Sequence, residues 1–181
     1  MKVGILALQG AYNSHQKKIQ ELGVNCILVK NKVALAQVDA LILPGGESTT
    51  MTYLLQKHQL WQPIIKSVQE IPILATCAGV VLLHNMGLLE INITRNGYGR
   101  QLESEIFSLT VNLDNAKKKI EAYFIRAPII NAIYSPEIQI MSYHVNKPVL
   151  IKKNNILAAT FHPEFCQDSC IHEYFIGMIS F

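Results

Sequence analysis

Residues 71–83 read IPILATCAGVVLL, and this stretch decides the fold class. The run IPILAT is apolar without polar alternation, which is typical of a strand that is buried on both faces. The following AGVVLLHNM begins with good helix formers, so Cys77 lies at a turn from a strand into a helix. Because such strands belong to parallel sheets with helices on both sides, the stretch predicts an α/β protein.

The rest of the first half repeats this alternation. Three further apolar runs are VGILAL (3–8), NCILVK (25–30) and ALILP (40–44). They alternate with longer segments of helical character. In the first of these segments His15, Ile19 and Leu22 recur at helical spacing, and Gly23 provides a stop. The first half is therefore predicted to be a βαβ-type unit.

After residue 100 the pattern changes to short strands separated by Asn, Pro and Asp, which read as hairpins or edge additions to the sheet. These runs are SEIFSLTVNL (104–113), EAYFIRAP (121–128), EIQIMSYH (137–144), PVLIKK (148–153) and NILAATFHP (155–163). A closing helix is predicted in DSCIHEYFIGMIS (168–180), with Asp168 as its N-cap. With no linker or repeat in view, residues 1–181 are predicted to form a single domain, in which a mostly parallel central sheet is flanked by helices and extended by antiparallel strands.

Composition and charge argue against a nucleic-acid-binding, secreted or membrane-spanning protein. The 181 residues are 50% hydrophobic and 16% charged, and the net charge of +3 is too small and too scattered to indicate nucleic-acid binding. The N-terminal MKVGILALQG lacks the length and cleavage region of a signal peptide, and no stretch approaches the ~18 apolar residues of a membrane span. Four unevenly spaced cysteines then indicate a reducing compartment, so we expect a cytoplasmic protein.

Cys77 is a candidate nucleophile because of its position at the turn. A lone cysteine on an apolar background is more often a small buried hydrophobe. A turn from a strand into a helix instead exposes the side chain at the top of the sheet and aims the helix N-terminus at it, which favours a thiolate. The N–H of Ala78 would point toward an adjacent oxyanion and supply half of an oxyanion hole.

A possible partner lies in ATFHPEF (159–165). Pro163 restricts His162 to the extended region, and residues i and i+2 of an extended chain project to the same side. His162 and Glu164 are therefore predicted to lie side by side, so that the carboxylate orients the imidazole while the imidazole activates a thiol. A His-x-Glu spacing is common by chance, and only the cysteine turn makes this one a candidate triad.

The third element is LILPGGESTTM (41–51). Its two glycines, Gly45 and Gly46, let the backbone turn sharply and present N–H groups, which could build the second half of an oxyanion hole. The alternative is a plain loop in which Ser48 or Thr49 caps the next helix. The stretch is not a phosphate loop, because no lysine follows the glycines at the required spacing.

Taken in order, PGGESTT (44–50), TCAG (76–79) and FHPE (161–164) resemble the class I, triad-type glutamine amidotransferases. Three more stretches are similar to the glutaminase subunits of pyridoxal 5'-phosphate synthases within that group: LALQGA (6–11), RNGYGRQ (95–101) and FIRAP (124–128). The match runs from Val3 to about Glu164. It implies a flavodoxin-like α/β fold.

The resemblance implies hydrolysis of L-glutamine to glutamate and ammonia by a two-step thioester route. Cys77 would be the nucleophile, His162 the general acid and base, and Glu164 the residue that orients His162. The glutamine-binding positions of the family map onto Gly46, Glu47, Ser48, Arg95, Ile125 and Arg126, and the oxyanion-hole positions onto Gly45, Gly46 and Ala78. No cofactor and no metal are implied. The implied partner is a pyridoxal 5'-phosphate synthase subunit, which takes the ammonia within a hetero-oligomer.

Three positions depart from the usual pattern of these subunits. Ala75 replaces a glycine two residues before the nucleophile, only His84–Met86 separate the nucleophile helix from GLLE, and Ile129 replaces a histidine after FIRAP. Two alternatives therefore stay open. One is the glutaminase of imidazole glycerol phosphate synthase, and the other is an inactive, partner-binding relative.

A metal site is conceivable at His162, Cys166, Cys170 and His172. Their spacing matches no standard zinc finger, and His162 has a better use in the triad, so we predict none. The remaining histidines have no partner that the sequence reveals and are predicted to be structural or solvated: His15, His58, His84, His144 and His172.

Overall fold

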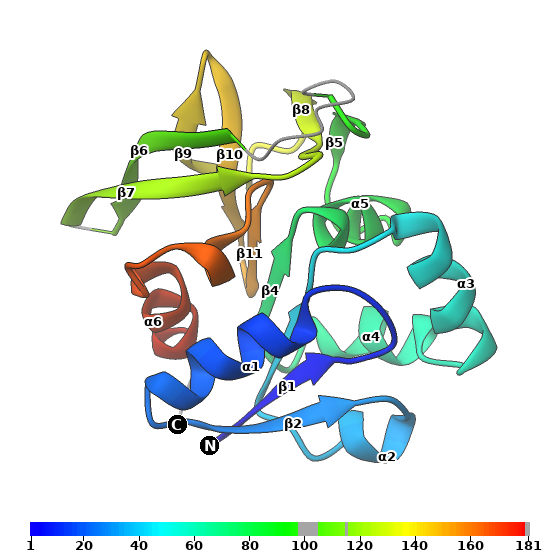
Figure 1. The fold of residues 1–181 in the computed structure, drawn as a ribbon. Coiled ribbons are helices and arrows are strands. Elements are labelled where there is room, and N and C mark those ends of the chain that lie inside the picture. The colour runs from blue at the N-terminus through cyan, green and yellow to red at the C-terminus, as the bar shows by residue number, and fades with distance from the viewer. Residues whose placement is uncertain (98–104, 115, 180–181) are drawn as a thin grey trace.

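Five parallel strands form the centre of the computed structural model, which describes residues 1–97, 105–114 and 116–179 (Figure 1). Their order across the sheet is β2, β1, β3, β4 and β11. The bounds are β1 Lys2–Leu6, β2 Asn25–Val29, β3 Ala40–Leu43, β4 Ile73–Thr76 and β11 Ile156–Ala159. All residues of β3, β4 and β11 are buried, as expected for apolar strands that are covered on both faces.

Two antiparallel strands complete this seven-stranded sheet: β10 (Lys147–Lys153), which pairs with β11, and β9 (Gln139–His144) at the edge. The predicted hairpin between PVLIKK and NILAATFHP is confirmed, but its predicted place at the edge of the sheet is wrong for β11. This strand pairs with β4 in parallel and lies inside the sheet. The physical reason is composition, because Ile156–Ala159 carries no polar side chain that could face water.

Two small antiparallel pairs lie outside the central sheet. The predicted hairpin is β6 (Glu105–Leu113) with β7 (Ala116–Phe124). The second pair, β5 (Ile91–Thr94) with β8 (Ile129–Ile133), was not predicted. Both pairs stand above the carboxyl ends of the parallel strands in Figure 1.

Helices cover the two faces of the sheet and enclose two hydrophobic clusters. One cluster, which includes Leu43, Leu55 and Leu82, lies under helices α2 to α5. The other, which includes Ile5, Ile19 and Phe161, lies under α1, α6 and the β6–β7 hairpin. The bounds are α1 Tyr12–Glu21, α2 Lys32–Leu35, α3 Ser48–Lys57, α4 Trp61–Ser67, α5 Ala78–Asn85 and α6 Cys170–Gly177. None of the helices within the described ranges has the length and hydrophobicity needed to cross a bilayer.

The helix ends agree with the sequence except at α6. Gly23 follows α1 with a φ of +71°, as its predicted stop role requires. The N-cap position of α6 is Ser169 rather than the predicted Asp168, one residue earlier. Asp168 nevertheless serves the helix, because its Oδ1 accepts a hydrogen bond of 2.7 Å from the N–H of Cys170.

The topology brings four chain segments together at one edge of the sheet. Parallel strands β1, β3, β4 and β11 end at this edge, and each is followed by one of the stretches that carry the family resemblance: LALQGA, PGGESTT, TCAG and FHPE. Open parallel sheets bind their ligands beyond the carboxyl ends of their strands. The fold therefore places the candidate residues where a ligand is expected.

Candidate active site

Cys77 occupies the turn between β4 and α5, with φ 47° and ψ −106°. Its N–H donates to the carbonyl of Ala159 on β11, at 2.8 Å, which anchors the turn to the neighbouring strand. The turn also requires a small residue at position 79, because a Cβ on Gly79 would lie 2.3 Å from the carbonyl oxygen of Leu43. The tight contact with β3 and the positive φ of Cys77 aim the thiol into the space above the sheet.

His162 follows β11 on the neighbouring strand end, and its N–H donates to the carbonyl of Tyr123 in β7. Its Nδ1 lies 2.7 Å from Glu164 Oε1, and both side chains are buried. The predicted proximity is therefore present, but the expected extended geometry is wrong at Glu164. Residues Pro163–Phe165 form a 3-10 turn, because proline is preorganised for the first position of a helical turn.

The pKa values of His162 and Glu164 are shifted strongly in opposite directions. Burial opposes a charge on His162, but the interactions with Cys77 and Glu164 outweigh it and raise the pKa of His162 to about 10. Burial likewise opposes the charge on Glu164, yet His15 and His162 hold the pKa of this carboxyl low, at about 2. The carboxylate therefore accepts the Nδ1 proton of His162, and Nε2 is the nitrogen left to exchange a proton with a thiol.

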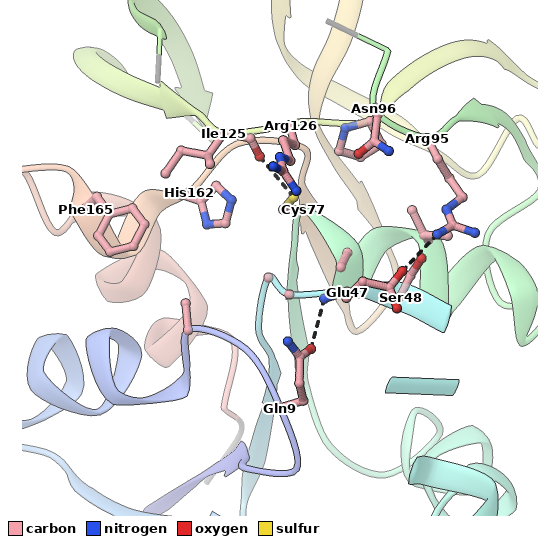
Figure 2. A pocket seen from close by; sticks show the side chains of 16 residues that line it. Gln9, Glu47, Ser48, Cys77, Arg95, Asn96, Ile125, Arg126, His162 and Phe165 are labelled. Atoms are coloured by element: carbon pink, nitrogen blue, oxygen red, sulfur yellow. Dashed lines mark hydrogen bonds and ion pairs between the residues drawn. The ribbon is translucent and has the colours of Figure 1, made fainter. Parts of the chain in front are cut away.

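Cys77 and His162 face one cavity of about 460 Å³ at the carboxyl edge of the sheet. Figure 2 shows Cys77 between His162 on one side and the Arg95–Glu47 pair on the other. The cavity is lined by Gln9, Ala11, Gly45, Gly46, Glu47, Ser48, Cys77, Ala78, Val81, Arg95, Asn96, Ile125, Arg126, Pro128, His162 and Phe165. Every residue predicted for the site lines it except Glu164, which lies behind His162.

The glycine loop before α3 packs directly against the Cys77–His162 pair. A Cβ on Gly45 would lie 2.4 Å from His162 Cε1, so only glycine fits there. The loop that follows β1 holds this segment from the other side. Ala11 N–H donates to Gly45 O at 2.9 Å, and Gln9 Oε1 accepts the N–H of Glu47 at 2.9 Å (Figure 2).

The three predicted oxyanion-hole donors differ in their surroundings. The N–H of Gly45 donates to the buried Thr76 hydroxyl at 3.0 Å and so points away from the cavity. The N–H of Ala78 is the first of α5, and the first N–H groups of a helix have no partner within the helix. Gly46 lines the same cavity as Ala78.

Two arginines lie at the cavity in different charge environments. Arg95 Nη2 donates to Glu47 Oε1 and to Thr49 Oγ1, both at 3.0 Å. Arg126 is exposed and has no ion pair with any side chain in the described ranges. Among the described residues, therefore, only the guanidinium group of Arg95 has a carboxylate partner.

Glu47 also caps helix α3. Its carboxylate accepts the N–H groups of Thr50, at 2.7 Å, and Thr49, at 3.2 Å, and the bond from Thr50 contributes most to lowering its pKa to about 2. The sequence alternative, in which Ser48 or Thr49 caps the helix, is therefore wrong. The cap position is occupied by the residue that also binds Arg95.

Several residues of the site escaped sequence reasoning. Gln9, Asn96, Pro128 and Phe165 line the cavity, and His15, Thr76 and His172 lie behind it. Phe165 stacks on the His162 ring, with centroids 5.5 Å apart. The sequence contains an indication for two of these residues. Gln9 lies in LALQGA, one of the stretches that carry the family resemblance, and His15 lies on the buried face of α1.

The three departures from the family pattern lie outside the cavity wall. Ala75 is fully buried in the sheet between Leu43 and Ala158, in the cluster under α5. The segment after α5 is a short turn at Met86, and Ile129 packs against Gly97. Of the RNGYGRQ stretch, residues 98–101 are outside the described residues.

Comparison with known proteins agrees with this geometry. Residues 5–180 match the SNO glutamine amidotransferase family. The chain is 35% identical over 189 residues to pyridoxal 5'-phosphate synthase subunit PdxT of Thermosipho africanus, covering 99% of each chain. It is 40% identical over 181 residues to the protein of the same name from Francisella tularensis, covering 98% of each. A crystal structure of a glutamine amidotransferase superposes with a TM-score of 0.90 at 32% identity, covering 98% of each chain.

Proposed function

Because the chain belongs to the SNO glutamine amidotransferase family, we propose that it is the glutaminase subunit of a pyridoxal 5'-phosphate synthase. In this role it hydrolyses L-glutamine to L-glutamate and ammonia. The observation that carries the proposal is the arrangement of a cysteine, a buried histidine and a buried carboxylate at one cavity. This is the set that nucleophilic acyl transfer requires.

Each residue of the triad has one task in the proposed reaction. His162 holds the proton of the Cys77 thiol as the sulfur bonds to the carboxamide carbon, and gives this proton to the departing nitrogen as the C–N bond breaks, which releases ammonia and leaves a thioester. His162 then takes a proton from water, the hydroxide oxygen attacks the thioester carbon, and the C–S bond breaks to give glutamate and the free thiol. Glu164 holds the His162 ring and stabilises its charged form.

The cavity supplies groups for the ends of the substrate. Arg126, which has no carboxylate partner among the described residues, and Arg95 are suited to the α-carboxylate, because a guanidinium fork binds both carboxylate oxygens. Glu47, Ser48 and Ile125 line the same cavity and complete the proposed glutamine site. In the proposed reaction Ala78 and Gly46, which line the cavity, donate to the oxyanion, while Gly45 donates to Thr76 and must turn before it can take part.

The ammonia is delivered to the synthase subunit, with which the chain forms a hetero-oligomer, and the glutaminase needs no cofactor of its own. The name shared by the relatives favours this partner over the cyclase of imidazole glycerol phosphate synthase. We also infer that residues 1–181 form one domain. All four cysteines are unpaired, which is consistent with work in the cytoplasm.

Ammonia release from glutamine tests the proposal. The chain is assayed with the pyridoxal 5'-phosphate synthase subunit, and with an imidazole glycerol phosphate synthase cyclase as the wrong-partner control. We expect turnover only with the former, and none for Cys77→Ala or Cys77→Ser, because the thiol carries the covalent step. A folded Cys77→Ala protein that still releases ammonia would exclude the proposed mechanism.

A further inference from the structure

Two histidines behind the triad are buried and have no part in the chemistry described so far. His15 on α1 and His172 on α6 are both 0% exposed. His15 Nδ1 lies 3.0 Å from His172 Nε2, and His15 Nε2 lies 3.3 Å from Glu164 Oε2. They continue the line that runs from Cys77 through His162 and Glu164, so that the two helices on this face of the sheet are joined to the triad.

Glu164 depends on this contact for its second oxygen. Oε1 is bound to His162 at 2.7 Å, while Oε2 is buried and has no better-placed donor than His15 among the described residues. A buried carboxylate oxygen without a hydrogen-bond donor lowers the stability of the fold, and nothing then prevents the carboxylate group from rotating away from His162. The His15 imidazole is the group that can satisfy Oε2 and keep Oε1 directed at His162.

The surroundings select one arrangement of protons. A proton on His15 Nε2 is shared with Thr76 Oγ1, which is 3.2 Å away, and lies beside Glu164 Oε2, which is 3.3 Å from the nitrogen and has no hydrogen bond of its own among the described residues. It leaves Nδ1 to accept the Nε2 proton of His172. His172 Nδ1, which is buried without a partner among the described residues, then carries only a lone pair. The opposite arrangement places a lone pair against the Glu164 carboxylate and leaves an unpaired, buried N–H on His172, which is the less favourable state.

We propose that His15 is a positioning residue of the glutaminase reaction, which fixes the Glu164 carboxylate through its Nε2 proton and is itself held in that tautomer by His172. The inference rests on the proposed function for its kinetic consequence, but the hydrogen-bond arrangement is a property of the chain alone. Burial lowers the pKa of both histidines, that of His172 to about 3, which keeps the two rings neutral as the arrangement requires.

The same ring also reaches the glycine loop. Thr76 Oγ1, which contacts His15 Nε2, accepts the N–H of Gly45. His15 therefore lies next to both Glu164, which binds His162, and Thr76, which binds the Gly45 peptide of the glycine loop. A change at His15 is expected to disturb both, and so to act on turnover more than on glutamine binding.

Kinetics of the complex with the synthase subunit give the first test. His15→Leu keeps the volume but removes the donor, and we expect kcat to fall about 10- to 100-fold with KM for glutamine changed by no more than about twofold. His15→Gln retains an N–H donor and should recover part of the loss. Ile19→Val, on the same buried face of α1, is the matched packing control and should leave kcat unchanged. A His15→Leu protein with the kcat of the Ile19→Val control would overturn the proposal.

A second test needs no activity, and its main readout needs no substitution. Long-range proton–nitrogen NMR spectra of the full chain, labelled with nitrogen-15 in its histidines, report which ring nitrogen carries the proton. We expect His15 and His172 as neutral rings protonated on Nε2, and a change in the His162 Nδ1 proton resonance in His15→Leu. A proton on His15 Nδ1 with Nε2 bare would overturn the proposal even if the Leu variant did not fold. Absence of glutaminase activity in the wild-type complex would instead contradict the proposed function, and the ring protonation would still be decided by these spectra.

Discussion

At the scale of single residues, Cys77 holds a backbone conformation that side chains seldom adopt. A non-glycine residue with a φ of 47° and a ψ of −106° stores about 1–3 kcal/mol of strain. The strain is tolerated because the hydrogen bond to Ala159 and the contact of Gly79 with β3 hold the turn on both sides. The backbone strain at Cys77 thus lowers the stability of the fold at the residue whose thiol faces the cavity.

Two inactive variants separate the strain from the chemistry. Cys77→Ala keeps the strained φ, whereas Cys77→Gly relieves it at an entropic cost of about 0.5–1 kcal/mol. We expect Cys77→Gly to be more stable than Cys77→Ala by about 1 kcal/mol in urea unfolding, with neither hydrolysing glutamine. A more stable alanine variant would show that the turn is unstrained.

The two partners of the thiol should differ in their importance. Loss of the imidazole in His162→Ala removes the proposed proton carrier and should lower kcat by about 10⁴-fold or more, as far as Cys77→Ala does. Glu164→Gln leaves the imidazole in place but misoriented and should cost less. Steady-state ammonia release with the synthase subunit measures both. Equal turnover of Glu164→Gln and wild type would reduce Glu164 to a structural residue.

The sequence reveals those site residues whose position depends on local rules. Cys77 follows from a strand that runs into a helix. His162 lies beside Glu164 as predicted from their short separation, although a 3-10 turn and not an extended chain brings them together. His15 does not, because its partner His172 is 157 residues away and only the packing of α1 beside α6 brings the rings together. Gln9 binds the loop at Glu47 for the same kind of reason.

At the scale of elements, the loop after β1 clamps the glycine loop before α3. Gly10 has a φ of +100°, and a Cβ at this position would lie 2.0 Å from the carbonyl oxygen of Gly45. A side chain here therefore pushes the Gly45 peptide out of place as well as straining its own backbone.

The Gly10→Ala variant should consequently lose turnover as well as stability. Gly23→Ala is a matched control, because Gly23 also has a positive φ of +71° but a Cβ added there would meet nothing within 4 Å. We expect both variants to lose about 1 kcal/mol or more of stability, and only Gly10→Ala to lose kcat beyond tenfold or so. Similar kcat values for the two would show that the clamp does not act on the reaction.

The orientation of the Gly45 peptide also bears on regulation. Its N–H is bound to Thr76 and not directed at the cavity, so the proposed oxyanion hole lacks this donor in the isolated chain. We expect docking of the synthase subunit to turn this loop and raise kcat at saturating glutamine, rather than only to improve glutamine affinity. The measurement is kcat with and without the synthase subunit. Equal values would mean that the loop is already organised for catalysis.

Element prediction succeeded where hydrophobic pattern alone decides and failed where pairing decides. The apolar runs of β1, β3 and β4 are unmistakable, and so is the β6–β7 hairpin. The position of β11 depends on its pairing with β4, which is a long-range contact. Its apolar composition indicates only that the strand lies inside the sheet, not which strand it pairs with. β5 and β8 are short, carry Asn and Thr, and are only partly buried, so their pattern is weak.

At the scale of the whole molecule, the buried histidines make stability depend on pH. Burial lowers the pKa of His172 to about 3, below its usual 6.5, so the unfolded chain takes up a proton below pH 6.5 that the folded chain refuses. The free energy of unfolding is therefore full above pH 6.5 and falls, by about 1.4 kcal/mol per pH unit for this group, as the pH drops toward 3. The raised pKa of His162 acts at higher pH, and its contribution is complete below 6.5.

Urea unfolding at about pH 7 and about pH 5 measures this slope. His172→Phe keeps a ring but cannot take up a proton, so it should lose less stability between the two pH values than wild type does. His58→Asn changes an exposed histidine and serves as the control. An unchanged slope in His172→Phe would mean that acid sensitivity arises elsewhere.

The place of β11 between β4 and β10 has a consequence for how the protein is made. Translation delivers Cys77, the proposed nucleophile, early, just after β4, but His162 follows β11, which begins only at Ile156. Until β11 is synthesised, the edge of β4 that pairs with it is apolar and unpaired in the nascent chain. Such an edge can pair with other chains and is a binding site for chaperones. In the proposed mechanism, a chain that stops short of β11 has the Cys77 thiol but no His162, so we expect an unfinished subunit to release no ammonia until the sheet is complete.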